Sequence, residues 1–166
     1  MSYAKIIDTL YIADCDVYRN QSFLENVNLI ISLYSTPDTL KVVPERCNFR
    51  YFDFEDLDFS SDAIIRNHTL TADEYKAEID LVCQETSKLI HSYLQRDKKV
   101  VVQCQAGINR SALIIGYYLI MYRNLSFETA YQLMKEANNR DRNYIPILIN
   151  EYFCQYLISL SQKNGA

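Results

Sequence analysis

The chain has 166 residues, of which 49% are hydrophobic and 23% are charged, and its formal net charge is −4. This length and apolar content predict a single domain over residues 1–166 with a full hydrophobic core. The acidic balance gives no general attraction to nucleic acid or acidic lipid, and no apolar stretch is long and charge-free enough to span a bilayer, so we expect no membrane partner.

The cysteines indicate a reducing environment. They stand at positions 15, 47, 83, 104 and 154, with neither paired spacing nor the clustering of metal ligands. Their odd number argues against a disulfide framework, so we expect an intracellular protein, cytoplasmic or nuclear. His68 and His91 have no partner at ligand spacing, and we expect neither a metal ion nor a cofactor.

The first third of the chain predicts strands separated by a short helix. Leu10–Ile12 and Leu29–Leu33 have the apolar, β-branched character of strands, with a helix between them from about Arg19 to Asn26. Phe49–Phe54 predicts a further strand rich in aromatic residues.

Helices dominate the rest. Apolar residues recur with helical spacing from Ala72 to about Arg96, and Thr71 and Glu74 form a capping box at the start. A nearly all-apolar helix over Ser111–Tyr122 is expected to be central, and an amphipathic helix begins at Phe127 with Ser126 as its cap.

The segment between the first two of these helices carries the chemistry. Lys99–Gln103 predicts a strand covered on both faces, because its three consecutive valines show no polar alternation. Cys104 then opens a loop that leads into a helix N-terminus, where unpaired backbone N–H groups and the helix dipole attract an anion.

Each residue of this loop has a role in the predicted anion site. The backbone N–H groups of the loop interior would bind phosphate oxygens; the residues are Gln105, Ala106, Gly107, Ile108 and Asn109. Gly107 supplies the backbone freedom of the curl, and Arg110 adds a bidentate fork. The same field favours the thiolate form of Cys104, which would attack phosphorus.

The run Cys104–Ser111 resembles the active-site loop of the cysteine-based protein tyrosine phosphatases, and its surroundings resemble the compact dual-specificity phosphatases. Further matches follow the order of that family along the chain, at Leu10–Asp14, Phe23–Leu24, Val27–Leu33, Leu125–Ala130 and Asn150–Leu157. The resemblance implies an α/β fold with a central, mostly parallel sheet flanked by helices.

The resemblance also implies supporting residues. Ser111 would assist departure of the thiolate when phosphocysteine is hydrolysed; capping of the helix is its alternative role. Asn150 matches a family asparagine that supports the loop. Gln103 departs from the family, which has histidine at this position, and a glutamine can hydrogen-bond but cannot carry a charge. We therefore expect activity that is slow for the family.

A general acid must protonate the leaving oxygen. In the family this acid follows a strand of the form apolar-x-apolar-x-Asp, which Phe52–Asp56 reproduces, so Asp56 is the first candidate. Asp58 is the second, and Asp73 competes by its spacing from Cys104, because residues 60–71 look like an insertion. The alternative is that these carboxylates only solvate a loop.

The predicted activity is metal-independent hydrolysis of phosphotyrosine, phosphoserine and phosphothreonine in phosphoproteins, through a phosphocysteine. Two alternatives stay open. The stretch Gly107–Arg110 is similar to RNA 5′-phosphatases and to some viral enzymes, and the abundance of Ile, Asn and Tyr suits an AT-rich viral genome. Gln103 is also compatible with a weakly catalytic domain that binds phosphorylated partners, a pseudophosphatase.

Overall fold

The computed structural model describes residues 1–60 and 70–165, and its centre is a five-stranded sheet. The strands lie in the order β1-β2-β5-β3-β4 and are β1 (Tyr3–Ile7), β2 (Leu10–Ala13), β3 (Leu29–Ser32), β4 (Asn48–Tyr51) and β5 (Val100–Gln103). Only the β1–β2 pair is antiparallel; the other three pairs are parallel. The predicted α/β class with a mostly parallel sheet is confirmed.

The central strand β5 is buried along its whole length, as its valines predict. Val100 and Val102 pack into the larger core beneath the long helices, whereas Val101 packs on the opposite face of the sheet. This alternation is the period of two expected for a strand between two layers.

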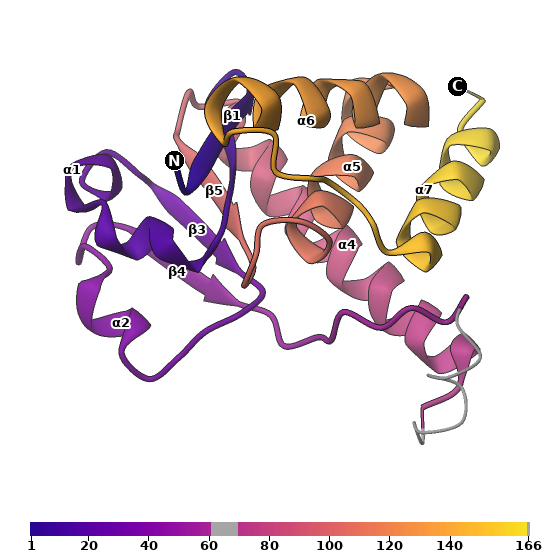
Figure 1. Cartoon of the computed structure of the whole chain (residues 1–166), viewed down its shortest axis with the longest axis horizontal. Helices are drawn as coiled ribbons and strands as arrows, with labels where there is room; N and C mark the ends of the chain where they lie inside the picture. Colours follow the sequence, from indigo (N-terminus) through magenta and orange to yellow (C-terminus); the bar gives the residue numbers. More distant parts are fainter. Residues whose placement is uncertain (61–69, 166) are drawn as a thin grey trace.

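The long helices gather on one side of the sheet (Figure 1). They are α4 (Ala72–Leu94), α5 (Arg110–Arg123), α6 (Phe127–Asp141) and α7 (Glu151–Lys163). The other side carries the 3-10 helix η1 (Cys15–Arg19) and α1 (Gln21–Leu24), while the short α2 (Thr39–Val42) connects β3 to β4. Because β2, β5, β3 and β4 run parallel to one another, their carboxyl ends lie at one common edge of the sheet.

Helix α5 is central, as predicted. Its residues from Ser111 to Ile120 are all buried, so α5 packs on every side. At Gly116 a side chain would meet Leu157 of α7, since a Cβ built there lies 2.7 Å from its Cδ1. The predicted capping box of Thr71 and Glu74 is present at the start of α4, and Ser126 caps α6.

One predicted strand needs correction, and one observed strand had no prediction. The strand predicted over 49–54 ends at Tyr51. Phe52 N–H makes a last bond to Ser32 O, and the carbonyls of Phe54 and Glu55 then bond the side chains of Arg110 and Tyr75 instead of a strand. Strand β1 was not predicted.

Most of the expected insertion at residues 60–71, and His68 within it, lies outside the described residues. Within residues 1–60 and 70–165, no helix is long and apolar enough to cross a membrane.

Candidate active site

The loop Cys104–Arg110 links the end of β5 to the start of α5, at the edge where the parallel strands end (Figure 1). Cys104 is buried, with 3% of its surface exposed. Gly107 has φ +61°, a left-handed conformation that glycine adopts without strain. A Cβ at this position would lie 2.9 Å from the carbonyl of Ala13, so the site requires glycine for space as well.

The first carbonyls of this segment are bound from outside the loop. Gln103 O accepts a hydrogen bond of 2.8 Å from Leu33 N–H, and Gln105 O accepts one of 3.0 Å from Cys15 N–H. Cys104 O accepts from the side-chain Nε2 of Gln103 at 2.8 Å. These bonds turn the carbonyls toward the protein.

The next carbonyls are bound by the segment that follows α6. Arg142 donates to Ala106 O at 2.9 Å and to Gly107 O at 2.7 Å, and Leu148 N–H donates to Ile108 O at 2.8 Å. Every carbonyl from residue 103 to 108 is therefore engaged.

The N–H groups of the loop are left free. In the part of the chain that the structure describes, the backbone N–H groups of residues 105–109 have no acceptor. Since a peptide plane points its N–H opposite to its C=O, carbonyls bound on the outside leave these donors directed inward. The arrangement is a nest of donors with a thiol at its base, suited to a phosphate or similar oxyanion.

Arg110 stands at the helix end of the loop. Its Nη1 donates to Leu33 O at 2.9 Å and to Phe54 O at 3.3 Å, which fixes the guanidinium. The ring of Tyr34 lies 5.9 Å from the guanidinium carbon. Nε of Arg110 is buried and has no partner among the described residues, so a donor remains for a phosphate oxygen.

Ser111 lies beside the thiol. Its Oγ is 3.2 Å from Cys104 Sγ and fully buried. The alternative role as a helix cap is wrong, because α5 begins at Arg110 and its N-cap is Asn109, which makes no side-chain capping bond. A hydroxyl at this distance can donate a hydrogen bond to a thiolate.

Gln103 is the centre of a buried polar network. Its Oε1 accepts a hydrogen bond of 2.8 Å from Tyr18 Oη, and it shares the single Ser32 hydroxyl proton with Tyr34 O, both oxygens lying 2.8 Å from Ser32 Oγ. Because Nε2 donates to the Cys104 carbonyl, Oε1 is the amide atom that faces the two hydroxyl groups and accepts from them. Burial raises the pKa of Tyr18 above its ordinary value, which keeps its hydroxyl protonated and donating. An uncharged amide thus lies directly before Cys104 in the chain.

Asp56 is held next to the loop. Its Oδ2 accepts from Asn109 Nδ2 at 2.9 Å and its Oδ1 from Asn150 Nδ2 at 2.7 Å. Asn150 N–H in turn donates to Asn109 Oδ1 at 3.0 Å. The structure therefore brings together three residues that the sequence had placed at the site separately.

The backbone around Asp56 is clamped by Tyr75 of α4. The Tyr75 hydroxyl donates to Glu55 O and accepts from Leu57 N–H at 3.1 Å. Tyr75 is completely buried, and burial raises its pKa above the ordinary value. The carboxylate thus projects from a fixed turn although Asp56 itself is exposed.

The two other acid candidates lie elsewhere. Asp58 accepts from the N–H groups of Glu151 and Tyr152, at 3.2 Å each, so it binds the first turn of α7. Burial alone raises the pKa of Asp58, but bonds from Ser60, Glu151 and Tyr152 together hold it below its ordinary value. Asp73 is an exposed residue in the first turn of α4.

Sequence reasoning missed three supporting residues. Arg142, Tyr18 and Tyr75 contact the site from separate elements, and none belongs to a local motif. Arg142 stands in a polar run, Asn138–Asn143, which gave no sign that one of its arginines is buried.

The described residues contain no group of three or more His, Cys, Asp or Glu side chains that could hold a metal ion. His91, expected at the surface without metal partners, is half-buried with its ring centroid 4.8 Å from that of Tyr122.

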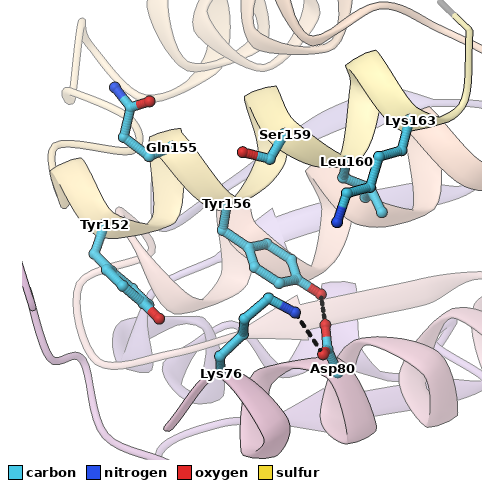
Figure 2. Close-up of a pocket in the computed structure, with 8 residues that line it drawn as sticks. All are labelled: Lys76, Asp80, Tyr152, Gln155, Tyr156, Ser159, Leu160 and Lys163. Atoms are coloured by element: carbon cyan, nitrogen blue, oxygen red, sulfur yellow. Dashed lines mark hydrogen bonds and ion pairs between the residues drawn. The ribbon is translucent and has the colours of Figure 1, made fainter. Parts of the chain in front are cut away.

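A groove between α4 and α7 is separate from this loop. Figure 2 shows its lining, in which Lys76 and the Tyr156 hydroxyl both contact Asp80. Its volume is about 250 Å³, and none of its lining residues belongs to Cys104–Ser111 or to the Asp56 turn. The groove is therefore a different surface from the Cys104 loop.

Comparison with known proteins gives consistent matches. The family model for the dual specificity phosphatase catalytic domain matches residues 40–163. Protein 123R of Invertebrate iridescent virus 6, named as a tyrosine phosphatase, is 36% identical over 56 residues, which are 34% of this chain and 39% of the viral protein. Dual specificity protein phosphatase 4 of Gallus gallus is 38% identical over 67 residues, 40% of this chain and 18% of that protein. The matches thus span less than half the length of these relatives.

The fold has solved counterparts. The crystal structure of human DUSP28 matches 100% of this chain and 97% of its own, with a TM-score of 0.69 at 16% identity. At that identity the likeness concerns the fold, and it agrees with the predicted architecture.

Proposed function

Because the chain belongs to the dual specificity phosphatase family, we propose that it hydrolyses phosphate monoesters on phosphoproteins, at tyrosine and at serine or threonine, through a phosphocysteine intermediate. The observation that carries this proposal is the outward binding of every carbonyl from residue 103 to 108, which leaves inward donors around Cys104. Such fixed donors stabilise the charge of a transferring phosphoryl group.

The first step forms a sulfur–phosphorus bond. The Cys104 thiolate attacks phosphorus, and the bond from phosphorus to the leaving oxygen breaks. Arg110 and the loop N–H groups bind the equatorial oxygens, while Asp56 gives its proton to the leaving oxygen. The product is a phosphocysteine and a free hydroxyl group on the substrate.

The second step returns the enzyme. Water attacks the phosphocysteine, Asp56 takes a proton from that water, and the thiolate leaves. Ser111 Oγ, 3.2 Å from Sγ, donates a hydrogen bond that stabilises the departing thiolate. Inorganic phosphate is released, and no metal ion takes part.

A domain that binds phosphate without turnover is the second candidate. The observation favouring it is the pair of amide donors on Asp56, since they hold both carboxylate oxygens in contacts with Asn109 and Asn150 rather than leaving them free to face a leaving oxygen. An RNA 5′ end is the third candidate. The net charge of −4 disfavours it, because binding a polyanion depends on neutralising phosphates with basic side chains.

The test is hydrolysis of an aryl phosphate by the purified chain, compared with Cys104→Ser. We expect turnover that falls by a factor on the order of 10³ or more in the variant, and a phosphocysteine trapped by rapid acid quench of wild type. Phosphate binding without any Cys104-dependent turnover would instead establish the second candidate. A preference for triphosphate-ended RNA over phosphopeptides that weakens with salt would establish the third.

A further inference from the structure

Arg142 is among the most deeply buried side chains of the protein, with 1% of its surface exposed. Its Nη2 donates to Ala106 O and to Asp14 Oδ2, at 2.9 and 3.0 Å. Its Nη1 donates to Gly107 O at 2.7 Å and lies 3.3 Å from Asn138 Oδ1. One guanidinium thus binds two consecutive carbonyls of the loop Cys104–Arg110, which we call the phosphate loop.

This contact sets the direction of two peptide N–H groups. The carbonyl of residue 106 shares a rigid plane with the N–H of Gly107, and that of residue 107 with the N–H of Ile108. When Arg142 holds both carbonyls on the outside, the N–H groups of Gly107 and Ile108 point into the nest. The planar fork of arginine suits this task, because its donors are fixed relative to one another.

The charge of Arg142 is balanced at the site. Asp14 Oδ2 lies 3.0 Å from Nη2, and Asp14 Oδ1 accepts from Asp16 N–H, so the carboxylate is held by the start of η1. A buried ion pair of this kind is weak evidence for stability, since desolvation offsets much of the attraction. Stability alone therefore does not account for a buried arginine directed at two loop carbonyls.

The packing around this contact is tight. A Cβ on Gly107 would lie 2.7 Å from Arg142 Nη2, so the loop approaches the guanidinium as closely as a glycine permits. Arg140, two residues earlier, offers a contrast, because its exposed guanidinium binds Asp141 and Lys5 O. Only one of the two arginines reaches the loop.

We propose that Arg142 is a positioning residue for phosphate binding, which orients the Gly107 and Ile108 N–H groups by holding the carbonyls of Ala106 and Gly107. The inference rests on the proposed function, since it assigns a role in binding the phosphoryl group. Arg142 does not touch the substrate and acts through the loop.

The experiment measures the dissociation constant of inorganic phosphate by its protection of Cys104 from alkylation by iodoacetate, together with kcat and KM for an aryl phosphate. Arg142→Lys keeps the charge and loses the fork, and we expect phosphate to bind about tenfold more weakly or worse, with KM raised by a similar factor. The matched control Arg140→Lys should bind phosphate as wild type does. Near-UV circular dichroism establishes that each variant is folded. If Arg142 had a purely structural role, its replacement would lower the melting temperature without changing the phosphate affinity of the folded protein.

Wild-type phosphate affinity in folded Arg142→Lys would overturn the proposal. If that variant does not fold, Asp14→Asn provides the second test, since it removes the charged partner of Nη2 and keeps an oxygen for the η1 cap. We expect phosphate binding to weaken about two- to fivefold in Asp14→Asn, and an unchanged affinity there would also overturn the proposal. A wild-type protein that binds phosphate without turnover would contradict the proposed hydrolysis, while the comparison of phosphate affinities would still decide the role of Arg142.

Discussion

Asn150 Nδ2 donates a 2.7 Å hydrogen bond to Asp56 Oδ1, across 94 positions of sequence. The same side chain caps α7, because its Oδ1 accepts from Phe153 N–H at 3.0 Å. One asparagine thus fixes a helix start and the candidate acid together, so the position of the carboxylate depends on where α7 begins.

Replacing Asp56 tests its assignment as the acid. Asp56→Asn is expected to lower kcat for an aryl phosphate by a factor of about 10² to 10⁴ and to remove the alkaline limb of the pH–rate profile. Asp58→Asn is the matched control, since Asp58 binds α7 and should leave that limb in place. An alkaline limb that persists in Asp56→Asn would exclude Asp56 as the acid.

Removing the Asn150 side chain should affect stability and activity together. Asn150→Ala loses the cap of α7, at a cost of about 1 kcal/mol in the free energy of unfolding, and frees Asp56. Ser126→Ala removes the corresponding cap of α6, which lies away from Asp56. We expect both variants to lose stability by urea denaturation, and Asn150→Ala to lose more because it also loses its bonds to Asp56 and Leu57 O. We expect kcat to be reduced only in Asn150→Ala. Equal kcat values in the two variants would show that Asn150 acts only as a cap.

The lowered pKa of Asp58 predicts a specific pH dependence of the free energy of unfolding. Its pKa is lower in the folded protein than its ordinary value of 3.8, because bonds from Ser60, Glu151 and Tyr152 outweigh its burial. The folded state therefore binds fewer protons, so this carboxylate stabilises the fold at pH above 3.8 and loses that effect as the pH falls through its folded pKa. The difference in unfolding free energy between wild type and Asp58→Asn should shrink with acidification. A difference independent of pH would contradict this assignment.

Tyr18 tests the amide network at Gln103. Tyr18→Phe deletes one of the two hydroxyl donors to Oε1 and should lower the free energy of unfolding by about 1 kcal/mol. We also expect a lower kcat, because Nε2 of Gln103 holds the Cys104 carbonyl. Tyr51→Phe is the control, since that exposed side chain donates its hydroxyl hydrogen bond to Asp53 and not to Gln103. Unchanged kinetics in Tyr18→Phe would separate the network from catalysis.

Local patterns predicted much of the fold. A few neighbouring residues were enough to predict the burial of β5 from its three valines, the start of α4 from the capping box at Thr71, and the central position of α5 from its apolar run. Strand β1 was missed although Ala4 and Ile6 are buried on either side of the exposed Lys5, because an alternation over only five residues, Tyr3–Ile7, is too short to stand out in the sequence. Its place at the sheet edge depends on pairing with β2.

The residues of the candidate site also differ in whether a local sequence pattern could predict them. Cys104, Gly107 and Arg110 could be predicted as site residues because the predicted chemistry needs fixed spacing within one loop. Arg142 was missed, since its role depends on tertiary contacts with carbonyls 35 and 36 residues away. For the acid, the strand pattern pointed to Asp56, which the structure brings into hydrogen bonds with Asn109 and Asn150.

The amide of Gln103 has a consequence for how the protein folds. Its two hydroxyl donors come from 71 and 85 positions away, and the Asp14–Arg142 pair spans 128. Closing such long separations is costly in chain entropy and slows folding, so contacts of this kind form after local helices. The phosphate loop therefore acquires its shape only when the first and last thirds of the chain have met. Oxyanion binding during refolding would accordingly report completion of the native topology, and a partly folded chain would present Cys104 without the inward-directed N–H groups of the folded loop.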